Sequence, residues 1–280
     1  MNISRRLLTL VAVAAATAGG LVTAPHADAQ EKNIVLLGDS LMANPTFAVA
    51  EHIQGPGKAT GNAPGDGRCP RGESRIAASL QRDTGGKVED FACTGAVAYA
   101  PVESEKRISK QVDTALAQGQ LNGGTTNVLI QIGMNDTWKA PGLYDVQSEN
   151  FVNEMKAQVG RVKAAAPNAK VTFLSYPSIV GTQGEVCPVH VNNAPPAVIP
   201  VGAVRAAMDS AHDWQRQSAA ATGSNWVNIE TETLGHDMCA PKEQRWVAGI
   251  IDNSSDPYNI TTHLTHRGND EVAKVIARHL

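Results

Sequence analysis

The sequence predicts an α/β protein, a three-layer α/β/α sandwich with a mostly parallel central sheet. Short apolar runs rich in β-branched residues alternate along the chain with stretches of helical periodicity. This alternation is typical of a parallel sheet that is covered by helices on both faces. No Pro- or Ser-rich linker, repeat or low-complexity tract interrupts the pattern. Once an N-terminal leader is removed, the length suits one substantial domain, which we expect over residues 30–280.

Five short apolar runs are the predicted strands. In chain order they are residues 33–37, 88–92, 127–132, 170–176 and 226–229. The stretches between them are predicted helices, at residues 73–81, 105–118, 147–166 and 201–221. A last helix is expected over residues 269–280, where apolar side chains recur at helical spacing: Val272, Val275, Ile276 and Leu280.

Polar motifs follow the first three predicted strands. The triplet GDS ends at Ser40, the block CTGA contains Gly95, and the block GMND contains Asn135. In parallel α/β sheets, active sites gather in the loops beyond the carboxyl ends of the strands. We therefore expect these three motifs to meet at one edge of the sheet.

The first 29 residues have the pattern of a secretory signal peptide. Arg5 and Arg6 precede the apolar run 7–22, and the A-x-A cleavage pattern ends at Ala29. The run is short for a membrane span, which favours cleavage before Gln30 over a retained anchor. We expect a protein that is secreted, either extracellular or in the cell envelope.

The charge of the chain argues against a nucleic-acid partner. Losing Arg5, Arg6 and Asp28 with the leader moves the formal net charge from −3 to −4. Nucleic-acid binding would require a basic surface, and an aromatic content of 4% offers little stacking area for bases.

Four cysteines remain in the mature chain, and in an exported protein an even number indicates disulfides. Three pairings of Cys69, Cys93, Cys187 and Cys239 are possible. Four free thiols are the alternative. No C-x-x-C pair supports a zinc site.

Ser40 is either a catalytic nucleophile or a turn residue, since Gly, Asp and Ser all favour turns. A serine hydroxyl becomes nucleophilic when a base takes its proton. His263, in the stretch TTHLTHRGND before the last predicted helix, is the candidate base. His266 completes an H-x-x-H spacing but lacks a supporting ligand set. We expect no metal and no cofactor.

An ester carbonyl under attack develops negative charge on its oxygen, which must be met by hydrogen-bond donors. The backbone N–H groups of Ser40 and Gly95 and the side-chain amide of Asn135 are the candidate donors. The alternatives are an ordinary turn for Gly95 and a helix N-cap for Asn135.

In order and spacing, Ser40, Gly95, Asn135 and His263 resemble the SGNH/GDSL hydrolase superfamily, and the match spans the mature chain. The resemblance implies an SGNH, flavodoxin-like fold. The stretches GRCPRGESRIAASL, FACTGA and GHDMCAPKEQRW are similar to the disulfide-containing branch of secreted actinobacterial esterases and lipases. That branch implies the pairings Cys69–Cys93 and Cys187–Cys239.

The chain departs from the superfamily three residues before His263, where Ile260 replaces the usual aspartate. Some esterases of the secreted branch use a main-chain carbonyl instead, and on that analogy the Ile260 C=O would accept the Nδ1–H of His263. Such a carbonyl fixes the tautomer without supplying a full charge. Asp256 is the alternative partner, with Asp252 behind it.

These features predict a secreted serine ester hydrolase that cleaves acyl esters of lipids or acylated glycans through an acyl-serine intermediate. It would use a Ser-His dyad or a carbonyl-assisted triad. One alternative is an acyltransferase or deacylase acting on cell-envelope glycans or glycolipids, with possible envelope association. Another is a non-catalytic carbohydrate-binding module. We expect a monomer.

Overall fold

A computed structural model describes residues 32–63, 67–192 and 194–280. The predicted signal peptide, residues 1–29, lies outside the described residues. None of the helices in the described part of the chain is long and apolar enough to cross a membrane.

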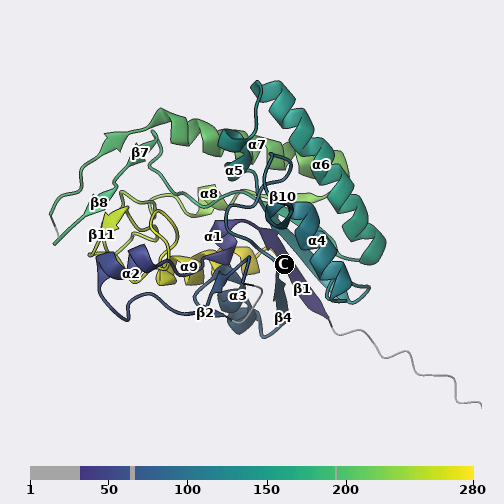
Figure 1. Ribbon diagram of the computed structural model, residues 1–280, viewed down its shortest axis with the longest axis horizontal. Coiled ribbons are helices and arrows are strands. Elements are labelled where there is room, and N and C mark those ends of the chain that lie inside the picture. Colours follow the sequence, from purple (N-terminus) through teal and green to yellow (C-terminus); the bar gives the residue numbers. More distant parts are fainter. Residues whose placement is uncertain (1–31, 64–66, 193) are drawn as a thin grey trace, which may run out of the picture.

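The central sheet has five strands, all parallel, in the order β10-β6-β5-β1-β4. Strands β10, β1 and β4 of this sheet are labelled in Figure 1. Their bounds are β1 Asn33–Gly38, β4 Lys87–Asp90, β5 Thr125–Gln131, β6 Lys170–Leu174 and β10 Asn225–Val227. All five predicted strands are present within a few residues of their expected ends. Because the strands are parallel, their carboxyl ends lie along one edge of the sheet, as the sequence predicts.

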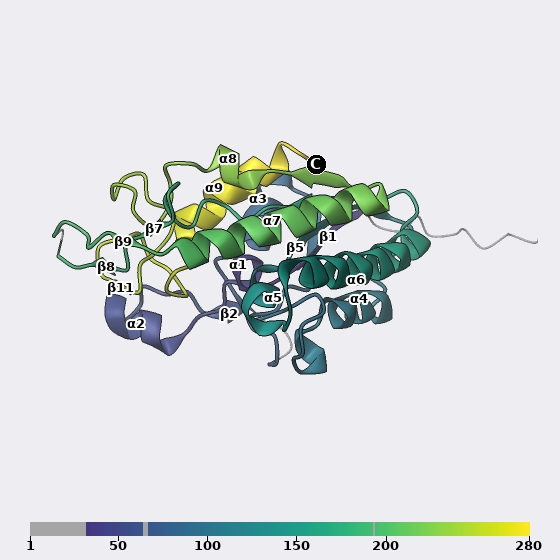
Figure 2. The ribbon, with the colours of Figure 1, turned by 90° about the horizontal axis from the view of Figure 1, so that it is seen from above.

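Helices cover both faces of the sheet, which confirms the predicted three-layer architecture (Figure 2). The long helices are α3 Ile76–Thr84, α4 Ile108–Ala117, α6 Tyr144–Ala165, α7 Gly202–Thr222 and α9 His266–Ala277. Helices α3 and α9 contribute to the apolar cluster on one face, α4 and α6 to the cluster on the other, and α7 to both.

Strand β1 shows why the sequence builds two layers around one sheet. Successive side chains of a strand point to opposite faces. Ile34 and Leu36 accordingly join the cluster with α3 and α9, whereas Val35 and Leu37 join the cluster with α4 and α6. The strand is buried along its whole length, as a central parallel strand requires.

Several short elements were not predicted. Helices α1 (Ser40–Ala43), α2 (Ala48–Gln54), α5 (Met134–Lys139) and α8 (Ile229–Glu232) lie in the connections. Three two-stranded sheets join β2 (Asn62–Ala63) to β3 (Arg71–Gly72), β7 (Glu185–Val186) to β9 (Ile199–Pro200), and β8 (Val189–His190) to β11 (Ile251–Asp252).

Two element ends differ from prediction for identifiable reasons. The strand expected to reach residue 229 ends at Val227, because the Asn228 side chain accepts a hydrogen bond from Thr231 N–H and starts α8. The last helix begins at His266 rather than residue 269, because the Thr265 hydroxyl caps it by accepting from Gly268 N–H.

Both disulfides implied by the resemblance are present. Cys69 pairs with Cys93, and Cys187 pairs with Cys239. The first joins the segment before α3 to the loop after β4. The second joins the segment after β7 to the loop after α8.

Candidate active site

Ser40 lies at the first position of α1, directly beyond the end of β1. The Asp39 carboxylate caps this helix by accepting a hydrogen bond from Leu41 N–H at 3.0 Å. Gly38 is held by Gln111, whose side chain makes two 2.8 Å hydrogen bonds with its N–H and C=O. These contacts fix the turn that presents the Ser40 hydroxyl at the edge of the sheet.

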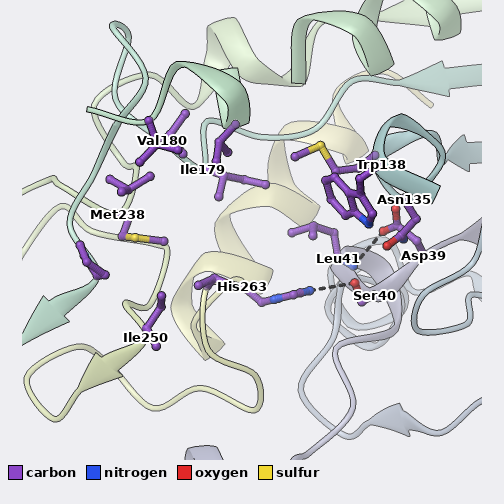
Figure 3. Close-up of a pocket in the computed structure, with 16 residues that line it drawn as sticks. Asp39, Ser40, Leu41, Asn135, Trp138, Ile179, Val180, Met238, Ile250 and His263 are labelled. Atoms are coloured by element: carbon purple, nitrogen blue, oxygen red, sulfur yellow. Dashed lines mark hydrogen bonds between the residues drawn. The ribbon is translucent and has the colours of Figure 1, made fainter. Parts of the chain in front are cut away.

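His263 reaches Ser40 across the sheet edge from the loop before α9. Its Nε2 lies 2.8 Å from Ser40 Oγ, and its Nδ1 lies 2.9 Å from the carbonyl oxygen of Thr261 (Figure 3). If Nδ1 donates to Thr261, then Nε2 is the basic nitrogen and faces the serine proton. Burial lowers the pKa of His263 below its ordinary value, although the Thr261 carbonyl opposes this shift. The imidazole is therefore kept in the neutral form that a general base requires.

The partner of His263 differs from the prediction by one residue. The main-chain carbonyl that contacts Nδ1 belongs to Thr261, not to Ile260. Thr262 explains the offset, since its φ of +62° turns the chain back so that the Thr261 carbonyl faces the imidazole of the residue two positions on. The prediction of Ile260 is corrected accordingly.

The two aspartates proposed as alternative partners make other contacts. Asp256 forms an ion pair with Arg267, with Oδ2 and Nε 2.7 Å apart. Asp252 accepts hydrogen bonds from the backbone N–H groups of Gly249, Ser254 and Ser255. The side-chain nitrogens of His263 contact Thr261 and Ser40 instead of either carboxylate.

Hydrogen bonds link the start of α5, which carries Asn135, to the loop after β4 that carries Gly95, here called the Gly95 loop. Asn135 Nδ2 donates to the Ala96 carbonyl at 3.0 Å, which leaves the second N–H of the amide for another acceptor. The buried Asp136 carboxylate accepts three backbone hydrogen bonds from the loop, given by the N–H groups of Ala98, Tyr99 and Ala100. Gly133, not Asn135, is the N-cap of α5. Asn135 is thus the second residue of α5, in its first turn, and its side chain contacts the Gly95 loop.

Gly95 adopts a backbone conformation that favours glycine, with φ of +74°. Its carbonyl accepts a hydrogen bond from Lys139 Nζ at 2.9 Å, so the peptide is held in one orientation. In the part of the chain that the structure describes, the N–H groups of Ser40 and Gly95 donate to no protein acceptor. Both remain available as donors.

A buried polar link that sequence reasoning missed connects the N-cap of α1 to the start of α5. The Tyr176 hydroxyl donates to Asp39 Oδ2 at 2.5 Å and accepts from Met134 N–H at 3.1 Å. Burial raises the pKa of Asp39 to about 6, against the lowering effect of its hydrogen bonds from Tyr176 and Leu41. The only sequence feature that marked Tyr176 was its position as the last residue of the strand predicted over residues 170–176.

A cavity of about 480 Å³ opens beside Ser40 and His263. In Figure 3, Asn135 and Trp138 of α5 lie on one side of it, and Val180, Met238 and Ile250 lie on the other. We define the apolar wall as Ile179, Val180, Val186, Pro188, Val201, Val204, Met238 and Ile250. The volume and apolar lining are typical of a site for a small, largely apolar ligand.

His266, the second histidine of the H-x-x-H spacing, lies apart from this cavity. Its Nε2 is 3.1 Å from Asn259 Oδ1. Among residues 32–63, 67–192 and 194–280, the structure places no group of three or more His, Cys, Asp or Glu side chains where they could hold a metal ion.

Comparisons with protein families and with curated proteins give one family match. The model of the GDSL-like lipase/acylhydrolase family matches residues 36–270. A search of curated proteins gave no match.

Solved structures share the fold at low sequence identity. A phospholipase A1 from Streptomyces albidoflavus has a TM-score of 0.55 at 20% identity, and an extracellular lipase from Streptomyces rimosus has 0.51 at 20%. Each alignment covers 89% of this chain and 98% of the other. A carbohydrate acetylesterase from Sinorhizobium meliloti has a TM-score of 0.51 at 15% identity, over 89% of this chain and 98% of that one.

Proposed function

This chain belongs to the GDSL-like lipase/acylhydrolase family and is a carboxylic ester hydrolase, and from that premise we propose that it works through an acyl-Ser40 intermediate with His263 as the base. One observation carries the proposal: His263 Nε2 lies 2.8 Å from Ser40 Oγ, and both residues line the cavity. This is the contact that a serine nucleophile needs in order to lose its proton.

In the proposed first step, Ser40 Oγ attacks the acyl carbon of the ester while His263 Nε2 takes the hydroxyl proton. The Thr261 carbonyl holds Nδ1–H and so keeps the ring in one tautomer. The imidazolium then gives its proton to the leaving alcohol, which departs as the acyl–Ser40 ester forms. In the second step His263 takes a proton from a water molecule, which attacks the acyl-Ser40 ester. The imidazolium then returns that proton to Ser40 Oγ as the bond to the acyl carbon breaks and the free acid leaves.

The negative charge that develops on the carbonyl oxygen would be met by three donors. These are the Ser40 N–H, the Gly95 N–H and the second N–H of the Asn135 amide. The hydrogen bonds of Asp136 and Lys139 hold the Gly95 loop against α5, which carries Asn135, before substrate binds. Such preorganised donors are among the largest contributions to catalysis of acyl transfer.

The apolar wall supports an acyl chain as the part of the substrate that enters the cavity. Each methylene removed from water is worth about 0.8 kcal/mol, so kcat/KM should rise about fourfold per carbon until the wall ends. Hydrolysis of p-nitrophenyl esters from C2 to C16 by the wild type and Ser40→Ala tests the proposal. Turnover by the wild type and none by the variant is expected. Turnover by the Ser40→Ala variant would exclude Ser40 as the nucleophile.

We also propose that residues 1–29 direct export and that the enzyme acts outside the cytoplasm as a monomer. The two disulfides favour an oxidising compartment, and the Streptomyces rimosus lipase of the same fold is extracellular. Protein recovered from culture medium should begin at Gln30 and should run as a monomer in light scattering; a retained leader or a stable dimer would contradict this.

A further inference from the structure

Three residues of the apolar wall are direct sequence neighbours of one disulfide. Val186 and Pro188 flank Cys187, and Met238 precedes Cys239. The disulfide brings the two cysteine Cα atoms to 5.0 Å across a sequence separation of 52 residues. The cross-link therefore fixes the distance between the two loop segments that carry these three wall residues.

A second contact joins the same two segments. His190 Nε2 lies 2.9 Å from the Met238 carbonyl, and its Nδ1 lies 2.8 Å from Arg245 Nη1. Because a guanidinium only donates, His190 Nδ1 must accept, and Nε2–H is left to donate to Met238. The histidine is thus a buried neutral bridge between the segment after Cys187 and the residue before Cys239.

The segment that carries Val186 and Pro188 does not belong to the central sheet. It is paired through two-residue strands, Val186 with Ile199 and Val189 with Ile251. Residues 186–204 contain no Asp, Glu, Lys or Arg, so no ion pair of their own side chains holds them. Loop segments of this kind open more easily than the core of a sheet, and cross-links then decide their position.

The other disulfide supports a different part of the site. Cys93 precedes the Gly95 loop by two residues, and its N–H donates to the Gly38 carbonyl at 3.0 Å beside Ser40. None of the residues that line the cavity is adjacent in sequence to Cys69 or Cys93. Cys69–Cys93 therefore borders the reacting atoms, whereas Cys187–Cys239 borders the wall.

From these observations we infer that the Cys187–Cys239 disulfide positions the apolar wall and thereby determines the selectivity of the enzyme for long acyl chains over short ones. This inference rests on the proposed function. A long chain uses the wall along its length, but an acetyl group fills little of it. Opening the cross-link weakens binding of the long chain far more than it alters proton transfer between Ser40 and His263.

The test compares Cys187→Ala/Cys239→Ala with the matched control Cys69→Ala/Cys93→Ala. Both are assayed on p-nitrophenyl acetate and p-nitrophenyl decanoate, with kcat and KM measured separately. In the first variant the ratio of kcat/KM for decanoate over acetate should fall about tenfold, equivalent to roughly 1.4 kcal/mol, mainly through a higher KM for decanoate. In the control, kcat should fall for both esters and the ratio should stay within about twofold of wild type.

A second measurement does not depend on folding of the variants. Folded wild type is reduced briefly with dithiothreitol and alkylated, and peptide mass mapping shows which disulfide has opened. Molecules alkylated at Cys187 and Cys239 should show the same fall in the decanoate-to-acetate ratio.

These experiments distinguish a failure of the disulfide inference from a failure of the proposed function. An unchanged ratio after loss of Cys187–Cys239, or an equal loss of activity on both esters, overturns the inference while the proposed function stands. A folded wild type that hydrolyses neither ester refutes the proposed function itself.

Discussion

Replacing Asp256 with Asn tests whether His263 works without a carboxylate partner. Where a carboxylate orients the catalytic histidine, its replacement lowers kcat by about 10⁴-fold. In this structure Asp256 pairs with Arg267 at 2.7 Å, and the two side chains are 37% and 35% exposed. The pKa of His263 is shifted by burial and by the Thr261 carbonyl. An exposed pair is worth at most about 1 kcal/mol, so we expect kcat to fall by no more than about fivefold.

The assay is steady-state hydrolysis of p-nitrophenyl butyrate by the wild type, Asp256→Asn and the control Asp270→Asn. Asp270 also forms an exposed ion pair, with Arg82 at 3.0 Å, and is 42% exposed. The control therefore removes one negative charge from α9, the helix that carries Arg267, at a carboxylate that contacts Arg82 and Ser79 instead of His263. Thermal unfolding of each protein shows that the folded state persists.

A thousandfold loss of kcat in Asp256→Asn, with Asp270→Asn close to wild type, would refute this reasoning. Asp256 would then orient His263 during turnover, and the Thr261 carbonyl would not be sufficient.

Three further predictions follow from the site. Asn135→Ala should lower kcat by about 10²-fold or more with little change in KM, because it removes a proposed oxyanion donor; unchanged kcat would exclude that role. The acid limb of kcat/KM should have its midpoint below the ordinary histidine pKa of about 6.5, because burial lowers the pKa of His263; a midpoint above 7 would contradict the assignment. Asp39→Asn tests the raised pKa of Asp39, about 6 when folded against 3.8 when unfolded. The protonated form is favoured by folding, so wild-type stability falls as pH rises from 5 to 8. The loss relative to the variant should be about 1.4 kcal/mol by urea denaturation, and parallel pH profiles would contradict it.

The sheet and the place where the site forms were predictable because both depend on strong local patterns. The runs that became β1, β4 and β5 are apolar and short, and each is followed by a polar motif. Parallel strands bring their carboxyl ends to one edge, so the strand pattern alone predicts that Ser40, Gly95 and Asn135 lie together. The fold class, both disulfides and the ester hydrolase activity predicted from the resemblance are confirmed.

The short helices at the site were not predictable by periodicity. Helix α1 has four residues and α5 has six, and neither repeats an apolar stripe. Such short helices depend on their caps and on tertiary contacts. Asp39 caps α1 with its carboxylate, but the same residue in the same triplet also fits an ordinary turn.

The contact of His263 with Thr261 depends on a backbone conformation that the sequence does not favour. A β-branched residue such as Thr262 rarely adopts positive φ, yet here it has φ of +62°. Local preference therefore gave no reason to choose Thr261 over Ile260. Surrounding structure imposes the turn, including the hydrogen bond from Thr262 N–H to the Gly249 carbonyl at 3.2 Å.

The remaining features that were not predicted, the Asp39–Tyr176 contact and the apolar wall, depend on residues far apart in the chain. Asp39 and Tyr176 are 137 residues apart in the chain, and no local pattern joins them. The apolar wall likewise comes from segments far apart in the chain, and nothing in the sequence distinguishes its members from ordinary core residues.

The measurement that tests the central claim most directly is covalent labelling of the folded enzyme with a fluorophosphonate, followed by mass mapping of the modified peptide. We predict one adduct, on Ser40, that forms rapidly in the wild type, far more slowly in His263→Ala, and not in Ser40→Ala. An adduct on another residue, or equal labelling of Ser40→Ala, would contradict the assignment of Ser40 as the nucleophile that His263 activates.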